Sequence, residues 1–243
     1  MSPFAVRILA ANALHHALDH SSQNYPKDAP EDVHNGPYWQ RHREIDTNLT
    51  TLTVYLPEKL QLSRNPRSLD AILVHMCTNL AIIQLHRSAL GLINQHSLPS
   101  YLVAQSQARL LPAAEGILAI FRAAGDSIGA AIRNPLLSFA AYTAATVFLE
   151  DFQAAQGLTE RSRQSENGLN LLARNLVFFG GRSPLVRALA FQLALDMKQT
   201  GYDASMMDTV RAHHEFLGDL ALRKRYTAIA LDVANARNIL SRS

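Results

Sequence analysis

The sequence predicts an all-α fold, a multi-helix domain of orthogonal or array-like arrangement with about seven or eight helices. Apolar residues recur at steps of three and four along most of the chain, and no stretch alternates for long enough to indicate a strand. Two pairs, Asn134-Pro135 and Ser183-Pro184, each place a capping residue before a proline, which is typical of the first residues of a helix.

Three helices are predicted in the first part of the chain. The first runs from about Pro3 to His20, and its apolar side consists of Phe4, Ile8, Ala11, Leu14 and Leu18. A proline-rich loop, Ser21 to Pro37, leads to a second helix that starts near Tyr38 and ends before Leu56-Pro57-Glu58. A long amphipathic helix then extends from Ser68 to Gln95.

The next helix, Ser100 to Ala124, contains Pro112. Proline removes a backbone donor and clashes with the preceding turn, so we expect a kink or a break there. An apolar helix from Pro135 to Gln156 follows, and residues Gly157 to Ser165 are predicted to be a polar linker.

Two further helices are predicted before the chain becomes more charged. One carries Leu169, Leu172, Leu176 and Phe179 and ends at Gly180-Gly181, and the other begins at Ser183-Pro184 and is closed by Gly201. We expect one helical domain over residues 1–204 and a helical tail over residues 205–243.

The composition excludes several classes of protein. With 48% hydrophobic and 18% charged residues the chain is globular, and a net charge of +3 is too small to indicate nucleic acid or an anionic membrane as a partner. The longest uncharged apolar run, Pro135 to Leu149, is shorter than the ~18 residues that span a bilayer, and we expect no signal peptide and no membrane segment. The single cysteine, Cys77, indicates a reducing compartment.

Ten histidines suggest a metal site, but no complete set of ligands accompanies them. His16 and His20 are four residues apart, and His213-His214-Glu215 is a second cluster, yet neither belongs to a zinc signature. Surface or helix-end roles are expected for these residues. His75 and His86 lie beside the apolar stripe of the long helix and are predicted to be hydrogen-bonded residues at the edge of the core. We predict no metal and no cofactor.

The sequence also contains no recognisable nucleophile or phosphate-binding loop, and Cys77 is expected to be a small buried residue within a helix. The segment Gly180-Gly181-Arg182-Ser183 joins two helices, so it is interpreted as helix punctuation and not as an anion site. Arg223-Lys224-Arg225 is interpreted as a solvated face, with a weak nuclear import signal as the alternative. The sequence therefore predicts no catalytic residues and no enzyme.

An ordered set of segments gives the chain a resemblance to a known family. After an entry at Ser2-Pro3-Phe4-Ala5, the segments are Tyr38–Asp46, Leu56–Leu60, Leu85–Ala89, Ala113–Glu115, Asn134–Phe139 and Ala144–Phe148. Their order and spacing resemble the region after the middle of fungal binuclear zinc-cluster transcription factors, over roughly Ser2 to Asp203.

The resemblance implies a nuclear protein in which six cysteines hold two zinc ions and contact DNA, followed by a large helical regulatory domain. This chain has one cysteine and no basic arm, so we expect it to lack the DNA-reading part. The resemblance begins after the middle of the family's proteins, so we also expect the first half of the regulatory domain to be missing. The chain would then be either a truncated piece or a relative that lost DNA binding. The function implied is that of a regulatory fragment in RNA polymerase II transcription, located in the nucleus. Its partners would be coregulators or its own missing N-terminal half, without specific DNA binding by this chain.

Residues of the first recurring segment are interpreted as structural. Trp39 is expected to be a packed anchor and Arg41 and Arg43 to make helix-end contacts, and no ligand-binding residue is assigned. The alternative function is a small-molecule-binding helical protein, or a minor helical enzyme with a site formed by His42, His86 and nearby acids. A polar cluster lining a pocket would favour that alternative.

A missing half would also leave an apolar helix face open. The best candidate is the Pro135 helix, which is apolar nearly all round and carries Ala141, Ala145, Phe148 and Phe152 on one face. The first helix, Phe4 to Leu18, is the second candidate. We therefore expect the isolated chain to self-associate.

Overall fold

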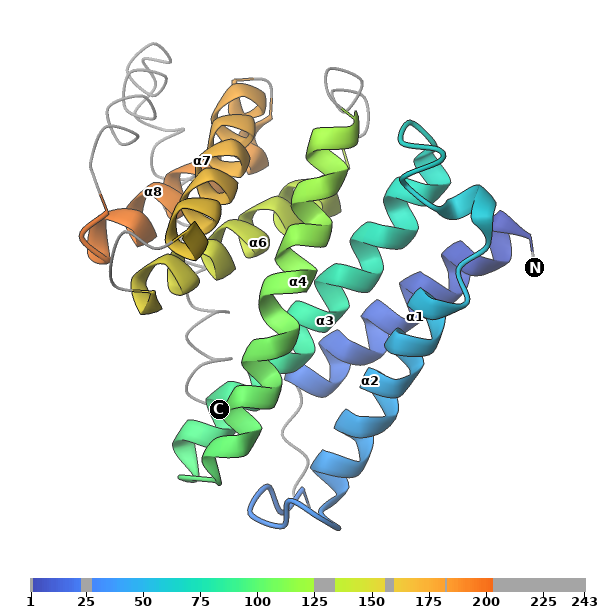
Figure 1. Cartoon of the computed structure of the whole chain (residues 1–243), viewed down its shortest axis with the longest axis vertical. Helices are drawn as coiled ribbons and strands as arrows, with labels where there is room; N and C mark the ends of the chain where they lie inside the picture. Colours follow the sequence, from blue (N-terminus) through green and yellow to red (C-terminus); the bar gives the residue numbers. More distant parts are fainter. Residues whose placement is uncertain (1, 23–27, 125–133, 156–159, 182, 203–243) are drawn as a thin grey trace. The chain divides into compact units, whose positions relative to one another are not determined.

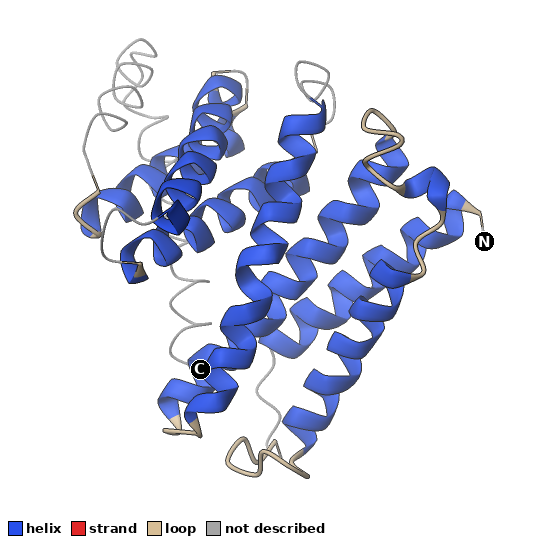
Figure 2. Cartoon of the chain, in the orientation of Figure 1, coloured by secondary structure: helices blue, strands red, loops and turns tan. Residues whose placement is uncertain are grey.

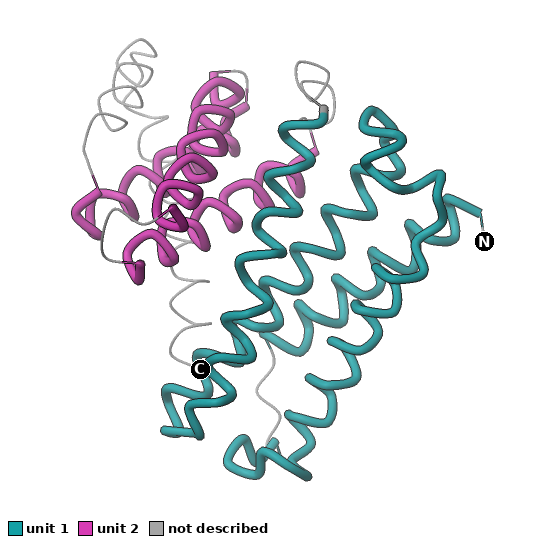
Figure 3. Tube along the Cα trace, in the orientation of Figure 1, with its two compact units in different colours: residues 1–124, 238–243 teal, residues 125–237 magenta. Residues whose placement is uncertain are grey.

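The computed structural model describes residues 2–22, 28–124, 134–155, 160–181 and 183–202. Within these ranges the chain forms seven α-helices, one short 3-10 helix and no strand, which confirms the predicted all-α fold (Figure 2). The helices belong to two compact units (Figure 3), each of which is described by itself. The single helical domain expected over residues 1–204 stays a prediction. The described residues end at residue 202, so the predicted tail, residues 205–243, lies outside them.

Unit 1 contains α1 (Pro3–Ser22), α2 (Pro37–Val54), η1 (Glu58–Leu60), α3 (Leu69–Gln95) and α4 (Ser100–Ala124). The helix α3 packs against α1 on one side and α4 on the other, and α2 contacts both α1 and α3 (Figure 1). By length and composition α3 is apolar enough to cross a membrane, but 72% of its most apolar window is buried inside the protein. That burial is typical of a core helix.

The start of α3 follows from its sequence. The Ser68 side chain accepts a hydrogen bond from the backbone N–H of Ala71 at 3.3 Å, and Asp70 in the first turn complements the helix dipole. The Asp70 carboxylate also accepts a hydrogen bond from Arg7 of α1 at 2.9 Å. A local cap therefore begins the helix, and an ion pair joins it to its neighbour.

The buried face of α1 differs from the predicted one. Of the expected apolar side only Leu14 is buried, whereas Phe4, Ile8 and Leu18 are exposed by 61%, 53% and 38%. The residues that face the core are Val6, Ala10, Leu14, Ala17, His20 and Ser21. Small side chains let two helices approach closely, so the alanines pack inward and the bulkier residues stay outside. Self-association of the chain stays a prediction. In unit 1 it would involve the exposed apolar side chains of α1, which are those of Phe4, Ile8 and Leu18.

The helix α4 is continuous from Ser100 to Ala124, so the predicted break at Pro112 is wrong, and the alternative, a kink, stays a prediction. Pro112 is exposed, while the next two residues, Ala113 and Ala114, are buried. Packing of α4 against α3 holds the turns on both sides of the proline in place.

Unit 2 contains α6 (Pro135–Ala154), α7 (Glu160–Gly180) and α8 (Pro184–Gln199), and α6 packs against both of the others. The two expected caps differ. The Asn134 side chain accepts a hydrogen bond from the Leu136 N–H at 3.0 Å, whereas Ser183 makes no side-chain cap bond at the start of α8. Proline at the first position favours both helices.

The predicted polar linker is wrong from Glu160 onward, because α7 begins there, and residues 156–159 lie outside the described ranges. The polar side chains of this turn make contacts with α6. The Ser165 hydroxyl donates to the Asp151 carboxylate at 2.6 Å, and the Arg161 guanidinium forms an ion pair with the same carboxylate. Polar residues that were predicted to form a linker therefore attach one helix to another.

The proposed open face on α6 is also wrong. Of the predicted face, Ala141, Ala145 and Phe148 are buried and Phe152 is half-buried, and Tyr142 and Val147 on the other sides of the helix are buried too. A helix that is apolar nearly all round is here the interior helix of unit 2.

Candidate functional site

Five aromatic rings from three helices of unit 1 form a buried ring cluster. His20 of α1 stacks on Tyr38 of α2 with their centroids 4.4 Å apart. Trp39 meets Tyr38 edge-on at 5.1 Å, and His42 meets Trp39 at 5.5 Å. His86 of α3 closes the set at 5.1 Å from His42. All five side chains are buried, so the cluster fixes the place where α1, α2 and α3 meet.

A polar network continues from the ring cluster to α4. The Asp46 carboxylate accepts a hydrogen bond from the His86 ring at 3.3 Å and another from Arg109 at 2.6 Å. Arg109 also donates to the Thr50 hydroxyl at 3.0 Å. Burial raises the pKa of Asp46, but the hydrogen bonds from His86 and Arg109 outweigh it and lower that pKa to about 2. The carboxylate therefore stays charged and joins α2, α3 and α4.

The other two histidines of the cluster are neutral at pH 7. Burial, with a smaller effect of the nearby Arg41 charge, lowers the pKa of His20 to about 4. Burial, with smaller effects of His86 and His20, lowers the pKa of His42 to about 3. Both ring nitrogens of His20, and Nδ1 of His42 and His86, have no hydrogen-bond partner among the described residues. Such unsatisfied buried nitrogens are energetically costly.

The start of α2 is tied to the segment before it. The Trp39 indole donates to the Pro30 carbonyl at 2.8 Å, and Arg43 donates to the carbonyls of Val33 and His34 at 2.9 and 2.7 Å. Arg41 forms an ion pair with Asp28. These contacts agree with the interpretation of Trp39 as an anchor.

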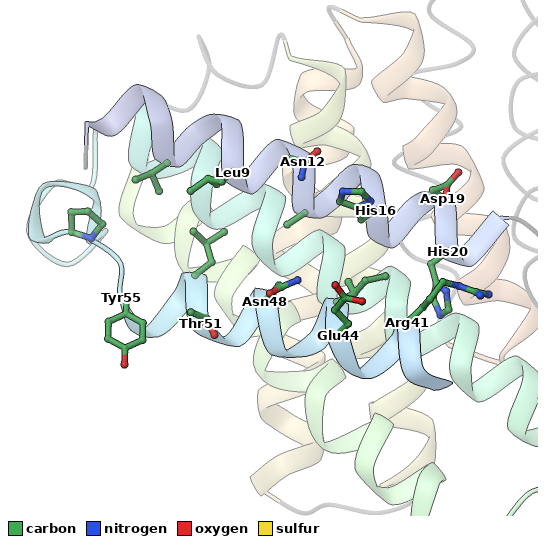
Figure 4. A pocket seen from close by; sticks show the side chains of 15 residues that line it. Leu9, Asn12, His16, Asp19, His20, Arg41, Glu44, Asn48, Thr51 and Tyr55 are labelled. Carbon is green, nitrogen blue, oxygen red and sulfur yellow. The ribbon is translucent and has the colours of Figure 1, made fainter. Parts of the chain in front are cut away.

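A groove of about 570 Å³ lies between α1 and α2, next to the ring cluster (Figure 4). Polar side chains of α1 and α2 face each other across it, and apolar side chains lie between them and near Tyr55. The lining residues are Val6, Leu9, Asn12, Ala13, His16, Asp19, His20, Arg41, Glu44, Ile45, Asn48, Thr51, Leu52, Tyr55 and Pro57. His20 is the point where the groove meets the ring cluster.

The histidines noted in the sequence have different surroundings. His16 and His20 both line the groove, but only His20 is buried. In the described ranges no three or more His, Cys, Asp or Glu residues are placed to hold a metal ion. The His75 ring contacts the Leu60 carbonyl at 3.0 Å, as expected of a hydrogen-bonded residue at the edge of the core. The second cluster, His213-His214-Glu215, lies outside the described residues, as does Arg223-Lys224-Arg225.

Two other sequence interpretations can be compared with the structure. Cys77 is buried, and burial raises the pKa of its thiol to about 11, so it is a packed residue and not a thiolate. Gly180 ends α7, and its carbonyl accepts a hydrogen bond from the Arg187 side chain at 2.9 Å. This contact is consistent with helix punctuation at Gly180-Gly181.

The residues of the alternative function, His42 and His86, do come together with an acid, Asp46. None of the three lines the groove, whereas His20 of the same ring cluster does. The sequence did not reveal the part played by Arg109, whose partner Asp46 is 63 residues away in the chain. No family model, curated protein or solved structure matches the chain.

Proposed function

We propose that the chain is a regulatory fragment of a fungal zinc-cluster-type transcription factor that acts in the nucleus through protein or effector contacts in RNA polymerase II transcription. One observation carries the proposal. Two of the recurring segments, Tyr38–Asp46 and Leu85–Ala89, meet in the ring cluster and its polar network. The segments that carry the resemblance therefore contribute to the packing between helices and not to a reactive site, as expected of a regulatory scaffold.

The chemistry of the ring cluster supports a non-catalytic role. A general acid or base must come within hydrogen-bond reach of its substrate, and His42 and His86 are buried among other rings. The Asp46 carboxylate, the best candidate acid, is held by His86 and Arg109. The same groups that could form an active site instead join three helices, α2, α3 and α4.

A tethering experiment tests the proposed function. The full chain is fused to an unrelated DNA-binding domain in yeast cells that carry one reporter gene for activation and one for repression. We expect the fusion to change transcription of at least one reporter relative to the DNA-binding domain alone. A fusion carrying Leu80→Asp, which places a charge in the core of α3, should lose the effect. Unchanged transcription from both reporters would contradict the proposal.

The chain alone should show no sequence-specific binding to duplex DNA. Specific readout requires an element that enters a groove together with several phosphate contacts, and the net charge of +3 offers little electrostatic attraction. An electrophoretic mobility-shift assay against random and selected duplexes, at about 150 mM salt where exposed charges are screened, checks this. A single sequence-selective shift under these conditions would refute the prediction.

The alternative function, small-molecule binding, is favoured by a separate observation. The groove between α1 and α2 has the volume of a typical ligand site and an uneven distribution of polar groups. Binding there is compatible with the regulatory role, because an effector is one of the contacts through which such a domain would act.

A further inference from the structure

We infer that the groove between α1 and α2 binds an elongated amphipathic small molecule with an apolar body and a protonated amine head. This inference gives the effector class for the proposed regulatory function, on which its biological meaning rests. The binding itself is a property of the groove and is tested by itself.

The shape of the groove favours a chain-like ligand. The lining residues extend along α2 from Arg41 to Leu52 and on to Tyr55 just after its end, a distance of about 20 Å at the rise of an α-helix. The volume of about 570 Å³ is within the range of small-molecule sites. The groove is therefore elongated along the two helices, and its length suits a chain-like ligand.

One end of the groove is apolar and open. Leu9 is exposed by 44% and Tyr55 by 80%, and Val6, Leu52 and Pro57 complete this end. Figure 4 shows Leu9 of α1 and Tyr55 at the same end of the groove, away from His20 and Arg41. A ligand body lying here would remove these apolar surfaces from water, which favours binding.

The other end offers mainly acceptors. Glu44 is exposed and carries a carboxylate, and His16 faces it from α1 (Figure 4). His20, 4% exposed, contributes a neutral imidazole whose two nitrogens have no partner among the described residues. The side-chain amides of Asn12 and Asn48, midway along the groove (Figure 4), can both accept and donate.

The charges at this end favour a cation over an anion. The one guanidinium, that of Arg41, is paired with Asp28, so its charge is balanced within the protein. The exposed carboxylate of Glu44 places a negative charge at this end of the groove. A protonated amine would donate hydrogen bonds to Glu44 and to a neutral imidazole, whereas a carboxylate head would meet like charge.

Isothermal titration calorimetry of the full chain tests the inference with three probes that share one body: dodecylamine, dodecanol and dodecanoate, each kept below its aggregation concentration. We expect saturable binding of dodecylamine, weaker binding of dodecanol by about tenfold, and the weakest binding for dodecanoate. Circular dichroism at each ligand concentration checks that the helices stay folded. Equal or tighter binding of dodecanoate would overturn the amine head, and no saturable binding of any probe would overturn the site.

Variants at exposed positions locate the binding. Glu44→Lys should reverse the preference, so that dodecanoate binds more tightly than dodecylamine, while Glu115→Gln on α4 should leave the order unchanged. Thr51→Trp fills the apolar part of the groove next to Tyr55 (Figure 4), where the body of the ligand would lie, and should abolish binding of all three probes. Binding that survives Thr51→Trp, or an order that Glu44→Lys does not change, would place the ligand elsewhere. If binding fails while the tethered chain still regulates the reporters, the effector is lost but the regulatory function stands.

Discussion

Lowering the pH from about 7.5 to about 5.0 should reduce the free energy of unfolding by about 4 kcal/mol, through His20 and His42. Each ring is buried and neutral in the folded chain, and each becomes an ordinary exposed histidine after unfolding. Between about pH 6.5 and about pH 5.0 each of the two contributes about 1.4 kcal/mol per pH unit.

The direction of the effect follows from the lowered pKa values. The folded chain holds His20 at a pKa of about 4 and His42 at about 3, whereas an unfolded histidine titrates near 6.5. Below about pH 6.5 the unfolded chain binds protons that the folded chain does not, so stability is complete above that pH and falls below it. The lowered pKa of His75 acts in the same direction. Asp46, at about 2, loses its own stabilising contribution as the pH falls below the ordinary carboxyl range toward that value.

Urea unfolding at the two pH values, followed by tryptophan fluorescence, measures this change in the free energy of unfolding close to the two histidines. Trp39 is the single tryptophan of the chain and belongs to the ring cluster. His20→Phe keeps a ring against Tyr38 and removes one titrating group, so about half of the pH dependence should disappear. His15→Phe, at an exposed position on the same helix, is the matched control and should leave the pH dependence unchanged. Equal unfolding midpoints at the two pH values would show that these histidines are not held neutral.

The helices could be predicted from the sequence because their signals are local. Asn134 and Ser68 both mark helix starts within one turn of the residues they cap, and Gly180 marks an end in the same way. The packed faces could not be predicted equally well. On α1 the larger apolar residues determined which side of the helix was predicted to be buried. The side that packs against α3 instead contains the small residues Ala10 and Ala17, which allow the two helices to approach closely.

The candidate site depends on contacts between residues distant in the sequence. His20, His42 and His86 lie on three helices, and nothing in the local pattern of any one helix indicates that their rings meet. The groove is equally hidden, since it is formed by the facing sides of α1 and α2. Sequence reasoning identified His42 and His86 as a possible pair and did not include His20, the residue that joins the cluster to the groove.

In unit 2 the largest expected change in the free energy of unfolding comes from replacing a buried alanine of α6 with a larger residue. Ala141 and Ala145 lie one turn apart on this helix and are completely buried, whereas Ala154 at its end is exposed. The space beside α6 is already small: a Cβ added at Gly168 of α7 would lie 2.9 Å from the Phe148 ring. Added methyl groups in such a packed region force side chains and backbone to shift.

Ala145→Leu should therefore lower the free energy of unfolding by roughly 1–3 kcal/mol, and Ala141→Leu by a similar amount. Ala154→Leu is the matched control, because it makes the same substitution on the same helix at an exposed position, and leucine is nearly as favourable as alanine in a helix. Urea unfolding followed by circular dichroism reports on unit 2, which the fluorescence of Trp39 in unit 1 does not sense directly. Equal midpoints for all three variants would mean that α6 has room beside Ala141 and Ala145, and the interior position assigned to this helix would then be wrong.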